Sequence, residues 1–402
     1  MRPRVLSGMR PTGSMHLGHY HGALKNWVRL QDDYDCFYFV ADWHALTTHY
    51  EEREVIEKTV YDMVVDWLAA GLDPEKSTIF IQSRLPEHAE LFTLLAMGTP
   101  LGWLERVPTY KDQIEKLKDR DLATYGFLGY PLLQAADILI YKAAFVPVGE
   151  DQASHVELTR EVARRFNHLY GRRGDFEAKV AAALARLSKD DQRYYDKQRK
   201  AFGETGAAEA LAKGEAVIRR AASAVAGWMA DDTDLLLGHL RGSGKSVLAE
   251  PQALHTEVLK LPGLDGAKMS KSYGNAVLMR DEPAEVTKKI RGMTTDPARV
   301  RRGDPGNPEK CPVWDFHKVY SDAATRDWVV KGCTTAGIGC LDCKQPVIDA
   351  IIKEQQPWRE RAASLLADPK KVHWIVEMGT ERARTVAKTT MRDVRDAMGL
   401  NY

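Results

Sequence analysis

Short apolar runs alternate with longer amphipathic stretches in the first part of the chain. Several short segments are rich in β-branched, aromatic and other apolar side chains, which predicts buried strands at residues 4–7, 35–41, 77–82 and 145–148. The segments between them carry apolar side chains at helical spacing, which predicts helices at 18–31, 53–70, 130–141 and 151–166. Pro86 is placed to open another helix. This alternation predicts an α/β fold with a doubly wound parallel sheet.

The pattern changes near Gly171. Residues 172–250 are rich in Ala, Lys and Arg with little strand signal, which predicts a helical insertion. Its segment 242–246 is similar to the end of a phosphate-binding loop, but His239 stands where such a loop needs glycine, so we interpret it as a flexible loop. Beyond residue 272 the chain is expected to be mostly helical, ending in a mixed-charge amphipathic helix at 381–400.

Composition and charge limit the class of protein. The 402 residues include 57 Lys and Arg against 56 Asp and Glu, so any nucleic-acid partner must be met by local basic patches. No apolar run is long enough to span a membrane, and the N-terminus lacks the features of a signal peptide, so we expect a cytoplasmic protein. One segment is locally basic and predicts either a contact with a nucleic-acid backbone or an ordinary solvated face: Lys288, Lys289, Arg291, Arg299, Arg301 and Arg302.

Two short segments carry the clearest candidate chemistry. His16-Leu17-Gly18-His19 follows a glycine-rich turn at a strand-to-helix junction, where free backbone N–H groups and the helix dipole favour a phosphate. Lys268-Met269-Ser270-Lys271-Ser272 lies in a glycine-flanked loop and offers positive charge. A metal site that includes His21 and a solvated surface position are the alternatives for the histidines. Together, in this order, the two segments resemble the signature motifs of class I aminoacyl-tRNA synthetases.

Further segments extend this resemblance to the tryptophanyl-tRNA synthetase family, over most of the chain apart from the insertion. They are residues 7–13, 42–47, 134–139 and 146–152. The resemblance implies a Rossmann-like catalytic domain at 1–171, the helical insertion at 172–250, a segment at 251–282 that completes the catalytic domain, and a helical tRNA-binding domain at 283–402.

The resemblance also implies a reaction and its residues. L-Tryptophan is activated by Mg-ATP and transferred to tRNA(Trp), and the enzyme is expected to be a homodimer. His16, His19, Lys268 and Lys271 are expected to be catalytic. The ATP-binding positions are expected at Arg10, Pro11, Thr12, Gly18, His19, Gly149, Glu150, Asp151, Lys268, Met269, Ser270, Lys271 and Ser272. Those expected to bind the amino acid are Gly8, Tyr130, Gln134 and Asp137, with Asp137 accepting the indole N–H.

Tyrosine is the alternative amino acid. A glutamine three residues before the aspartate, as at Gln134, also occurs in tyrosyl-tRNA synthetases, and Tyr130 adds to that likeness. Residues 146–152, the following 155–160 and the terminal helix resemble the tryptophan enzyme instead. We therefore predict tryptophan as the substrate.

Four of the five cysteines cluster in the second half of the chain. Cys36 stands alone in a predicted strand and is expected to be a core residue. The others are Cys311, Cys333, Cys340 and Cys343, and only the last two form a close pair. Four thiolates suit a [4Fe–4S] cluster or zinc, and free thiols are the third alternative. The spacing is similar to that of a subset of bacterial tryptophanyl-tRNA synthetases that carry a [4Fe–4S] cluster, which favours the cluster.

Overall fold

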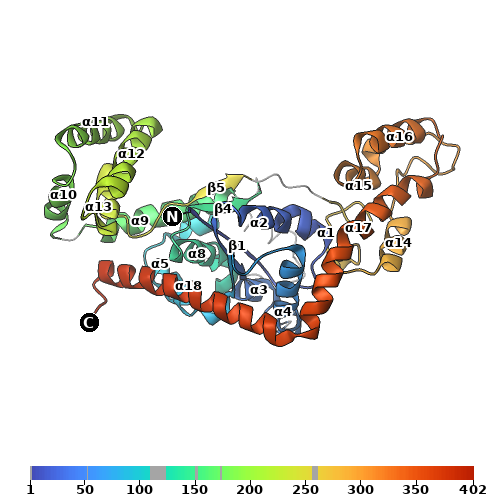
Figure 1. The fold of residues 1–402 in the computed structure, drawn as a ribbon, viewed down its shortest axis with the longest axis horizontal. Helices are drawn as coiled ribbons and strands as arrows, with labels where there is room; N and C mark the ends of the chain where they lie inside the picture. The colour runs from blue at the N-terminus through green and yellow to red at the C-terminus, as the bar shows by residue number, and fades with distance from the viewer. Residues whose placement is uncertain (1, 52, 109–123, 150–152, 173, 256–260) are drawn as a thin grey trace. The chain divides into compact units, whose positions relative to one another are not determined.

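The computed structural model describes residues 2–51, 53–108, 124–149, 153–172, 174–255 and 261–402 (Figure 1). These residues form two compact units. Unit 1 comprises Met1–Arg2, Ser7–Arg84 and His255–Glu381. Unit 2 comprises Pro3–Leu6, Leu85–Leu254 and Arg382–Tyr402.

The strands are β1 (Arg4–Met9), β2 (Asp35–Val40), β3 (Ser77–Ile81), β4 (Phe145–Val148) and β5 (Gln252–His255). They are hydrogen-bonded in the order β3-β2-β1-β4-β5. The pair β2–β3 is parallel, with Cys36 opposite Ser77, and β1–β4 is parallel, with Val5 opposite Phe145. Strand order that departs from chain order, with helices between parallel strands, confirms the predicted doubly wound α/β fold. The strand β5 was not predicted.

The first part of unit 1 contains the helices that follow β1, β2 and β3. They are α1 (Leu17–His19), the π-helix η1 (Tyr20–Leu24), α2 (Lys25–Leu30), α3 (Asp42–His49), α4 (Arg53–Ala70) and the short 3-10 helix η2 (Gln82–Arg84). Their core is aromatic, because the Trp27 ring stacks on Tyr38 with centroids 4.5 Å apart and meets the edge of Trp67 at 5.2 Å. The predicted helix at 18–31 is therefore present, but it contains a π-helical segment directly after His19.

The second part of unit 1 is helical, as predicted. It contains η4 (Lys271–Tyr273), α14 (Pro283–Gly292), η5 (Pro308–Lys310), α15 (Pro312–Tyr320), α16 (Ala323–Thr334), α17 (Cys340–Ala367) and the first part of α18 (Pro369–Met398). Helix α17 packs on α4 and α14. A Cβ atom at Gly379 would lie 1.9 Å from the carbonyl oxygen of Ile79, so α18 lies with its backbone directly against β3.

Unit 2 has two helical groups. The first contains α5 (Glu87–Ala96), α6 (Leu101–Glu105), α8 (Tyr125–Ile140) and α9 (Ala153–Tyr170), and α8 packs on all three of the others. Arg395, in the last part of α18, holds the Glu90 carboxylate through Nε and Nη2, at 2.6 and 2.5 Å.

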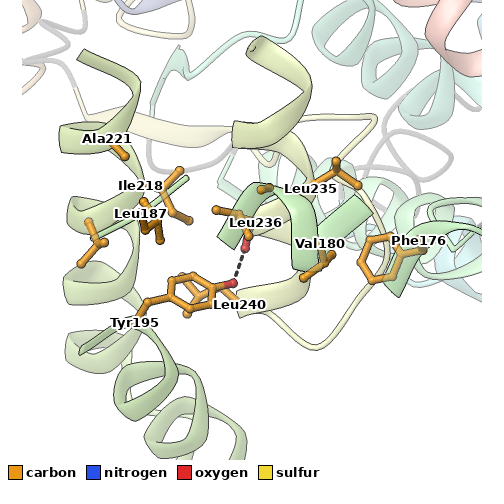
Figure 2. Packing of buried hydrophobic residues seen from close by; sticks show 11 residues of the cluster. Phe176, Val180, Leu187, Tyr195, Ile218, Ala221, Leu235, Leu236 and Leu240 are labelled. Atoms are coloured by element: carbon orange, nitrogen blue, oxygen red, sulfur yellow. Dashed lines mark hydrogen bonds between the residues drawn. The ribbon is translucent and has the colours of Figure 1, made fainter. Parts of the chain in front are cut away.

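The second group of unit 2 is the insertion. It contains α10 (Phe176–Leu184), α11 (Lys189–Thr205), α12 (Ala208–Ala224) and α13 (Ala230–Leu240), which enclose a separate hydrophobic core (Figure 2). Tyr195 is fully buried there, and its hydroxyl donates to the Leu236 carbonyl (2.8 Å). At the base, the Lys245 N–H donates to the Gly171 carbonyl (2.8 Å), and a Cβ atom at Gly244 would lie 2.1 Å from Gly171. The 242–246 segment thus packs against Gly171, where the chain enters the insertion.

None of the helices in the described ranges combines the length and the apolar character that crossing a bilayer requires.

Candidate active site

Two glycines of the predicted ATP and amino-acid sites lie at close approaches in unit 1. A Cβ atom at Gly8, in β1, would lie 2.6 Å from the Phe39 ring of β2. A Cβ atom at Gly18 would lie 3.0 Å from the His16 ring and 3.6 Å from Cβ of Met269. The second contact brings the two signature segments, far apart in the sequence, against each other.

The turn after β1 is held by side chains of α3 and α4. Arg10 Nη1 donates to Thr48 Oγ1 (3.5 Å), and Thr59 Oγ1 donates to the Pro11 carbonyl (2.7 Å). The Thr12 N–H donates to the Arg10 carbonyl (2.9 Å) and tightens the turn. The three predicted ATP-binding positions of this turn are therefore ordered next to α1.

His16 and His19 form a stacked pair at the start of α1. Their ring centroids are 3.7 Å apart with an angle of 20° between the planes, and the His16 N–H donates to His19 Nδ1 (3.3 Å). Burial, then the positive charge of Lys268, lowers the pKa of His16 to about 4. Burial, then His16 and Lys268, lowers the pKa of His19 to about 3. Both rings are therefore neutral near pH 7, and an accepting Nδ1 leaves the His19 proton on Nε2, free to be donated.

The Lys268–Ser272 loop is held in place through Met269 and Lys271. Met269 is buried, and Lys271 Nζ donates to Ser14 Oγ (3.2 Å), two residues before His16. The Ser272 side chain lies outside the described part of the structure. Lys271 thus reaches the turn that carries His16, and the positive charge of Lys268 acts on both histidine rings.

Asn275 organises this loop and was missed by the sequence analysis. Its side chain is buried, and Oδ1 accepts from the Ser270 N–H (2.7 Å). Its Nδ2 donates to Asp265 Oδ1 (2.8 Å) and to the Lys268 carbonyl (3.1 Å). An asparagine after Gly274, which has a positive φ of 66°, is a typical turn position and is the signal that could have identified it.

The segment after the loop joins the segment that carries His16. The Leu17 N–H donates to the Val277 carbonyl (2.9 Å), and the Met279 N–H donates to the Met15 carbonyl (3.0 Å). These backbone bonds place the Lys268 loop and the His16 turn on one short two-stranded link. The two signature segments are therefore joined by backbone hydrogen bonds.

A buried ion pair supports this link. Arg280 Nε lies 2.7 Å from Asp66 Oδ1, and its Nη2 also bonds the Asp62 carboxylate. Only 2% of the Asp66 side chain is exposed, and burial raises its pKa to about 7 although Arg280 opposes the shift. The Met15 backbone also bonds the Asp66 carboxylate. Asp66 therefore connects the two strands of the link, because it bonds the Met15 backbone on one strand and the Arg280 side chain that follows the other.

Asp137, in α8 of unit 2, is buried, which is what its predicted role requires. Its Oδ1 lies 2.6 Å from His88 Nδ1, and His88 Nε2 lies 2.7 Å from Tyr141 Oη. Asp137 is 1% exposed, and His88 and Tyr141 are fully buried. Sequence analysis missed His88, although a histidine inside the apolar face of a helix was a visible signal.

Gln134 and Tyr130 converge on one histidine in α9. Gln134 Oε1 lies 2.6 Å from His155 Nδ1, and Tyr130 Oη lies 3.4 Å from His155 Nε2. His155 belongs to the segment that resembles the tryptophan enzyme, so the two residues that suggested tyrosine are tied to it. Gly149 follows β4. The predicted ATP-binding residues Glu150 and Asp151 lie outside the described residues.

His21 takes part in a buried polar network, not in a site with His16 and His19. His21 Nε2 lies 2.8 Å from Tyr320 Oη and 3.2 Å from Glu354 Oε2, and Tyr320 donates to the same carboxylate oxygen (2.9 Å). This network joins η1 to α15 and α17. The pKa of Tyr20, next to it, is raised to about 12 by burial and then by Glu354.

The four clustered cysteines lie in or directly before three helices, α15, α16 and α17. Cys311 precedes α15, Cys333 lies near the end of α16, and Cys340 and Cys343 lie in the first turn of α17. Burial, then the other three thiols, raises the pKa of Cys343 to about 12. Among the described residues, no group of three or more His, Cys, Asp and Glu side chains is arranged to hold a metal ion. Cys36 is fully buried in β2, as predicted.

Two buried cations border the cysteines. Arg299 is 9% exposed, and its Nη1 lies 3.9 Å from Cys333 Sγ. Lys344 is 3% exposed and donates to the carbonyls of Arg291 (2.8 Å) and Met293 (2.5 Å). Burial lowers the pKa of Lys344, and the thiols of the cluster oppose that shift.

The predicted basic face is smaller than its sequence suggested. Arg299 is buried against the cysteines, and the Lys289 ammonium bonds Asp281 (2.7 Å) with 19% of its side chain exposed. The prediction was wrong for these two, because a helix and a loop turn part of any charged run inward. Lys288 and Arg302 are exposed by 80% and 82%.

Comparison with known proteins gives consistent matches. The family model of class I tRNA synthetases (W and Y) matches residues 1–191 and 235–355. The tryptophan–tRNA ligase of Ralstonia nicotianae is 63% identical over 399 residues, 99% of both chains. That of Thermotoga maritima is 44% identical over 401 residues, 99% of this chain and 100% of the relative. The crystal structure of Campylobacter jejuni tryptophanyl-tRNA synthetase complexed with ADP and tryptophan has a TM-score of 0.71 and 27% identity, covering 99% of this chain and 100% of that one.

Proposed function

Because the chain belongs to the class I tRNA synthetases for tryptophan and tyrosine, we propose that its two signature segments hold ATP while it ligates tryptophan to tRNA. Its activity is that of a tryptophan–tRNA ligase. The tryptophan carboxylate attacks the α-phosphate of Mg-ATP to give tryptophanyl-adenylate and pyrophosphate. The terminal adenosine hydroxyl of tRNA(Trp) then takes the acyl group and releases AMP.

One observation carries the assignment of the ATP site: the Lys268–Ser272 loop packs against the turn that holds His16 and His19, with a Cβ atom at Gly18 3.6 Å from Cβ of Met269 and Lys271 Nζ 3.2 Å from Ser14 Oγ. Neutral rings donate hydrogen bonds to phosphate oxygens, and Lys268 and Lys271 supply the positive charge. Nucleotidyl transfer needs positioning and charge stabilisation, with little covalent chemistry from the protein. Arg10, Thr12 and the start of α1 would complete the ATP contacts.

Asp137 is the proposed reader of the indole N–H. A buried carboxylate accepts hydrogen bonds only, so a side chain without a matching donor leaves its acceptor unpaired. The hydrogen bonds of Gln134 and Tyr130 to His155 support tryptophan over tyrosine. The polar groups that would bind the phenol hydroxyl of tyrosine are already engaged by His155.

The test is ATP–pyrophosphate exchange with each of the twenty amino acids, followed by charging of tRNA(Trp). Exchange with tryptophan, then charging, is the expected result. Exchange with tyrosine and not tryptophan would contradict the role of Asp137. Lys268→Met and Asp137→Asn are expected to lose activity for different substrates: the first raises the KM for ATP, and the second raises the KM for tryptophan.

We propose that the exposed basic face formed by Lys288, Arg301 and Arg302 contacts the tRNA backbone. Such contacts are salt-sensitive and independent of sequence. Arg301→Gln with Arg302→Gln should weaken tRNA binding and leave tryptophan-dependent exchange unchanged. Lys58→Gln, on α4 and 78% exposed, is the matched control. Equal loss of both activities would contradict the proposal.

We also propose a homodimer built on an apolar face of unit 2. Met97, Leu101 and Leu169 are 75%, 56% and 47% exposed, and Leu169 packs near Gly98. Arg165 Nε fixes this corner by donating to the Gly98 carbonyl (2.6 Å). Exposed apolar groups gathered at one corner are typical of subunit interfaces. Sedimentation should give a dimer, and Met97→Glu with Leu101→Glu should give a monomer; a monomeric wild type would contradict this.

For the cysteines we propose a [4Fe–4S] cluster held by Cys311, Cys333, Cys340 and Cys343. Arg299 and Lys344 fit this group, because buried cations need nearby negative charge and a cluster with four thiolates carries it. Arg299 Nε has no hydrogen-bond partner among the described residues, which also points to charge that the thiols would supply. Bound there, the cluster would cross-link the start of α15, the end of α16 and the start of α17.

Iron and sulfide analysis of anaerobically purified protein tests the cluster. We expect about four iron and four sulfide per chain and a brown chromophore in the wild type and in Cys36→Ala, the matched control. Cys333→Ser should lose both. Stoichiometric zinc without colour would support the zinc alternative. Protein that contains neither iron nor zinc would support free thiols.

A further inference from the structure

His88 is a buried histidine next to the proposed reader of the indole ring, and the reaction itself does not use it. It lies in the first turn of α5, while Asp137 lies in the last turn of α8 and Tyr141 follows that helix. Asp137 and Tyr141 are four residues apart and so lie on one side of α8. The imidazole of His88 bridges them, with one ring nitrogen at hydrogen-bonding distance from each.

We propose that His88, oriented by Tyr141, is a positioning residue that keeps Asp137 an ionised hydrogen-bond acceptor and thereby sets the selectivity for the indole N–H. This inference rests on the proposed role of Asp137. It assigns to α5 a part in amino-acid recognition that none of the signature segments provides.

The order of the hydrogen bonds follows from the donors available. Burial, then the negative charges of Asp137 and Glu87, raises the pKa of Tyr141 well above 10, so its phenol keeps its proton. The phenol can then donate to His88 Nε2, which leaves the imidazole proton on Nδ1, facing Asp137 Oδ1 at 2.6 Å. A donor on that oxygen favours the ionised carboxylate.

The opposite tautomer would remove the selectivity. If His88 carried its proton on Nε2 alone, Nδ1 would face Asp137 with a lone pair, and the carboxyl group would have to be protonated. A protonated carboxyl group is itself a donor and no longer demands an N–H from the substrate. The Arg4 guanidinium, which donates to the Tyr141 carbonyl (2.8 Å), and the pair of Arg384 with Glu87 (3.9 Å) hold the surrounding charges in place.

The experiment measures the ratio of kcat/KM for tryptophan to kcat/KM for 3-(3-benzothienyl)alanine in ATP–pyrophosphate exchange. This analogue has a sulfur atom in place of the ring N–H and nearly the same shape. His88→Leu should lower the ratio at least about tenfold, mainly through loss of rate with tryptophan, because a hydrogen bond to a charged group is at stake. His88→Asn keeps a donor near the Nδ1 position and should retain more of the ratio than His88→Leu.

Tyr141→Phe tests the inference even where His88→Leu does not fold, because it removes only the hydroxyl, and it should also lower the ratio. The matched control is Tyr195→Phe in the insertion, where the hydroxyl also lies against a histidine, His239 (3.0 Å), and the ratio should not change. Equal losses for both amino acids in the His88 and Tyr141 variants, with the ratio unchanged, would overturn the inference.

Asp137→Asn separates this inference from the role on which it rests. If Asp137→Asn leaves the ratio unchanged, Asp137 does not read the ring N–H, and the proposed recognition fails together with the inference. If Asp137→Asn collapses the ratio while the His88 and Tyr141 variants keep it, the recognition stands and only the inference is overturned.

Discussion

Replacing Asn275 with alanine should slow adenylate formation without unfolding the protein. The asparagine makes three hydrogen bonds that hold the Lys268–Ser272 loop, to the Ser270 N–H, the Lys268 carbonyl and Asp265. Each net hydrogen bond contributes about 0.5–1.5 kcal/mol, so the ordered loop should lose roughly 2–4 kcal/mol relative to other loop conformations. Because the proposed role of Lys268 requires it to be in place as charge develops on the phosphates, we expect this loss to add to the activation barrier.

A loss of about 2 kcal/mol corresponds to a roughly 30-fold lower kcat/KM for ATP in pyrophosphate exchange. The KM for tryptophan and the midpoint of thermal unfolding should change little, since the affected bonds are local to the loop. Asp265→Ala removes one of the three bonds and should give a smaller loss, while Asn307→Ala, another loop asparagine whose side chain caps Glu309 N–H (3.0 Å), should give none. A kcat/KM for ATP within twofold of wild type in folded Asn275→Ala would refute this reasoning.

Three other perturbations test the structure at different points. Arg280→Met should destabilise the protein by about 3–5 kcal/mol in chemical unfolding, because it leaves the Asp66 carboxylate buried without its partner, and a second change to Asn at Asp66 should restore part of that loss. Because folding lowers the pKa of His16 to about 4 and of His19 to about 3, the unfolded chain binds more protons between those values and pH 6.5, so the unfolding free energy should fall as the pH drops through that window. Exchange should accordingly show no inflection near pH 6.5 from these rings, and such an inflection, absent from variants of either histidine, would contradict their neutral state. Tyr195→Phe should lower the stability of the insertion by about 1–2 kcal/mol, since it leaves a buried carbonyl without its donor, and tryptophan-dependent exchange should remain at the wild-type rate.

Much of the fold was predictable because its elements carry strong local patterns. The helix at Arg53–Ala70 and the strands β2 and β4 agree with the prediction to within about one residue at each end, since their apolar spacing leaves little choice. The strand β5 (Gln252–His255) was missed because it is short and lacks β-branched residues; it forms because the Gln252 N–H finds the Ala144 carbonyl (2.9 Å). Tertiary pairing decided that strand, not local propensity.

The start of α8 shows a different limit. The prediction began at Tyr130, but the helix begins at Tyr125, where the Thr124 side chain caps the Phe127 N–H (3.2 Å). Two glycines and Pro131 weaken the local helical signal. The helix persists because it packs on α5, α6 and α9. The capping threonine was the one local signal that could have moved the predicted start.

The residues of the candidate site also fall into those that a local sequence pattern predicts and those that it does not. Residues that we propose contact the substrate, such as His16, Lys268 and Asp137, belong to short motifs, and the sequence alone was enough to propose them. Residues that hold them, such as Asn275 and His88, were not, because their role depends on contacts between segments that no local pattern connects. A polar side chain in an apolar helix face is a weak signal on its own, since a buried histidine is more often satisfied in the core than engaged in function.

The residues that hold the two proposed sites in position have the same physical character. Asn275, Asp66 and His88 are each buried and polar, and each hydrogen-bonds a residue that we propose faces the substrate, or a neighbour of such a residue. Burying such a group costs free energy unless its partners are complete, so an apolar core would serve stability equally well or better. Fixed geometry is what an apolar residue cannot supply, because dispersion contacts are not directional whereas hydrogen bonds are. Variants of Asn275 and His88 should therefore separate rate and selectivity from stability, whereas variants in the aromatic core around Trp27 should lower all three together.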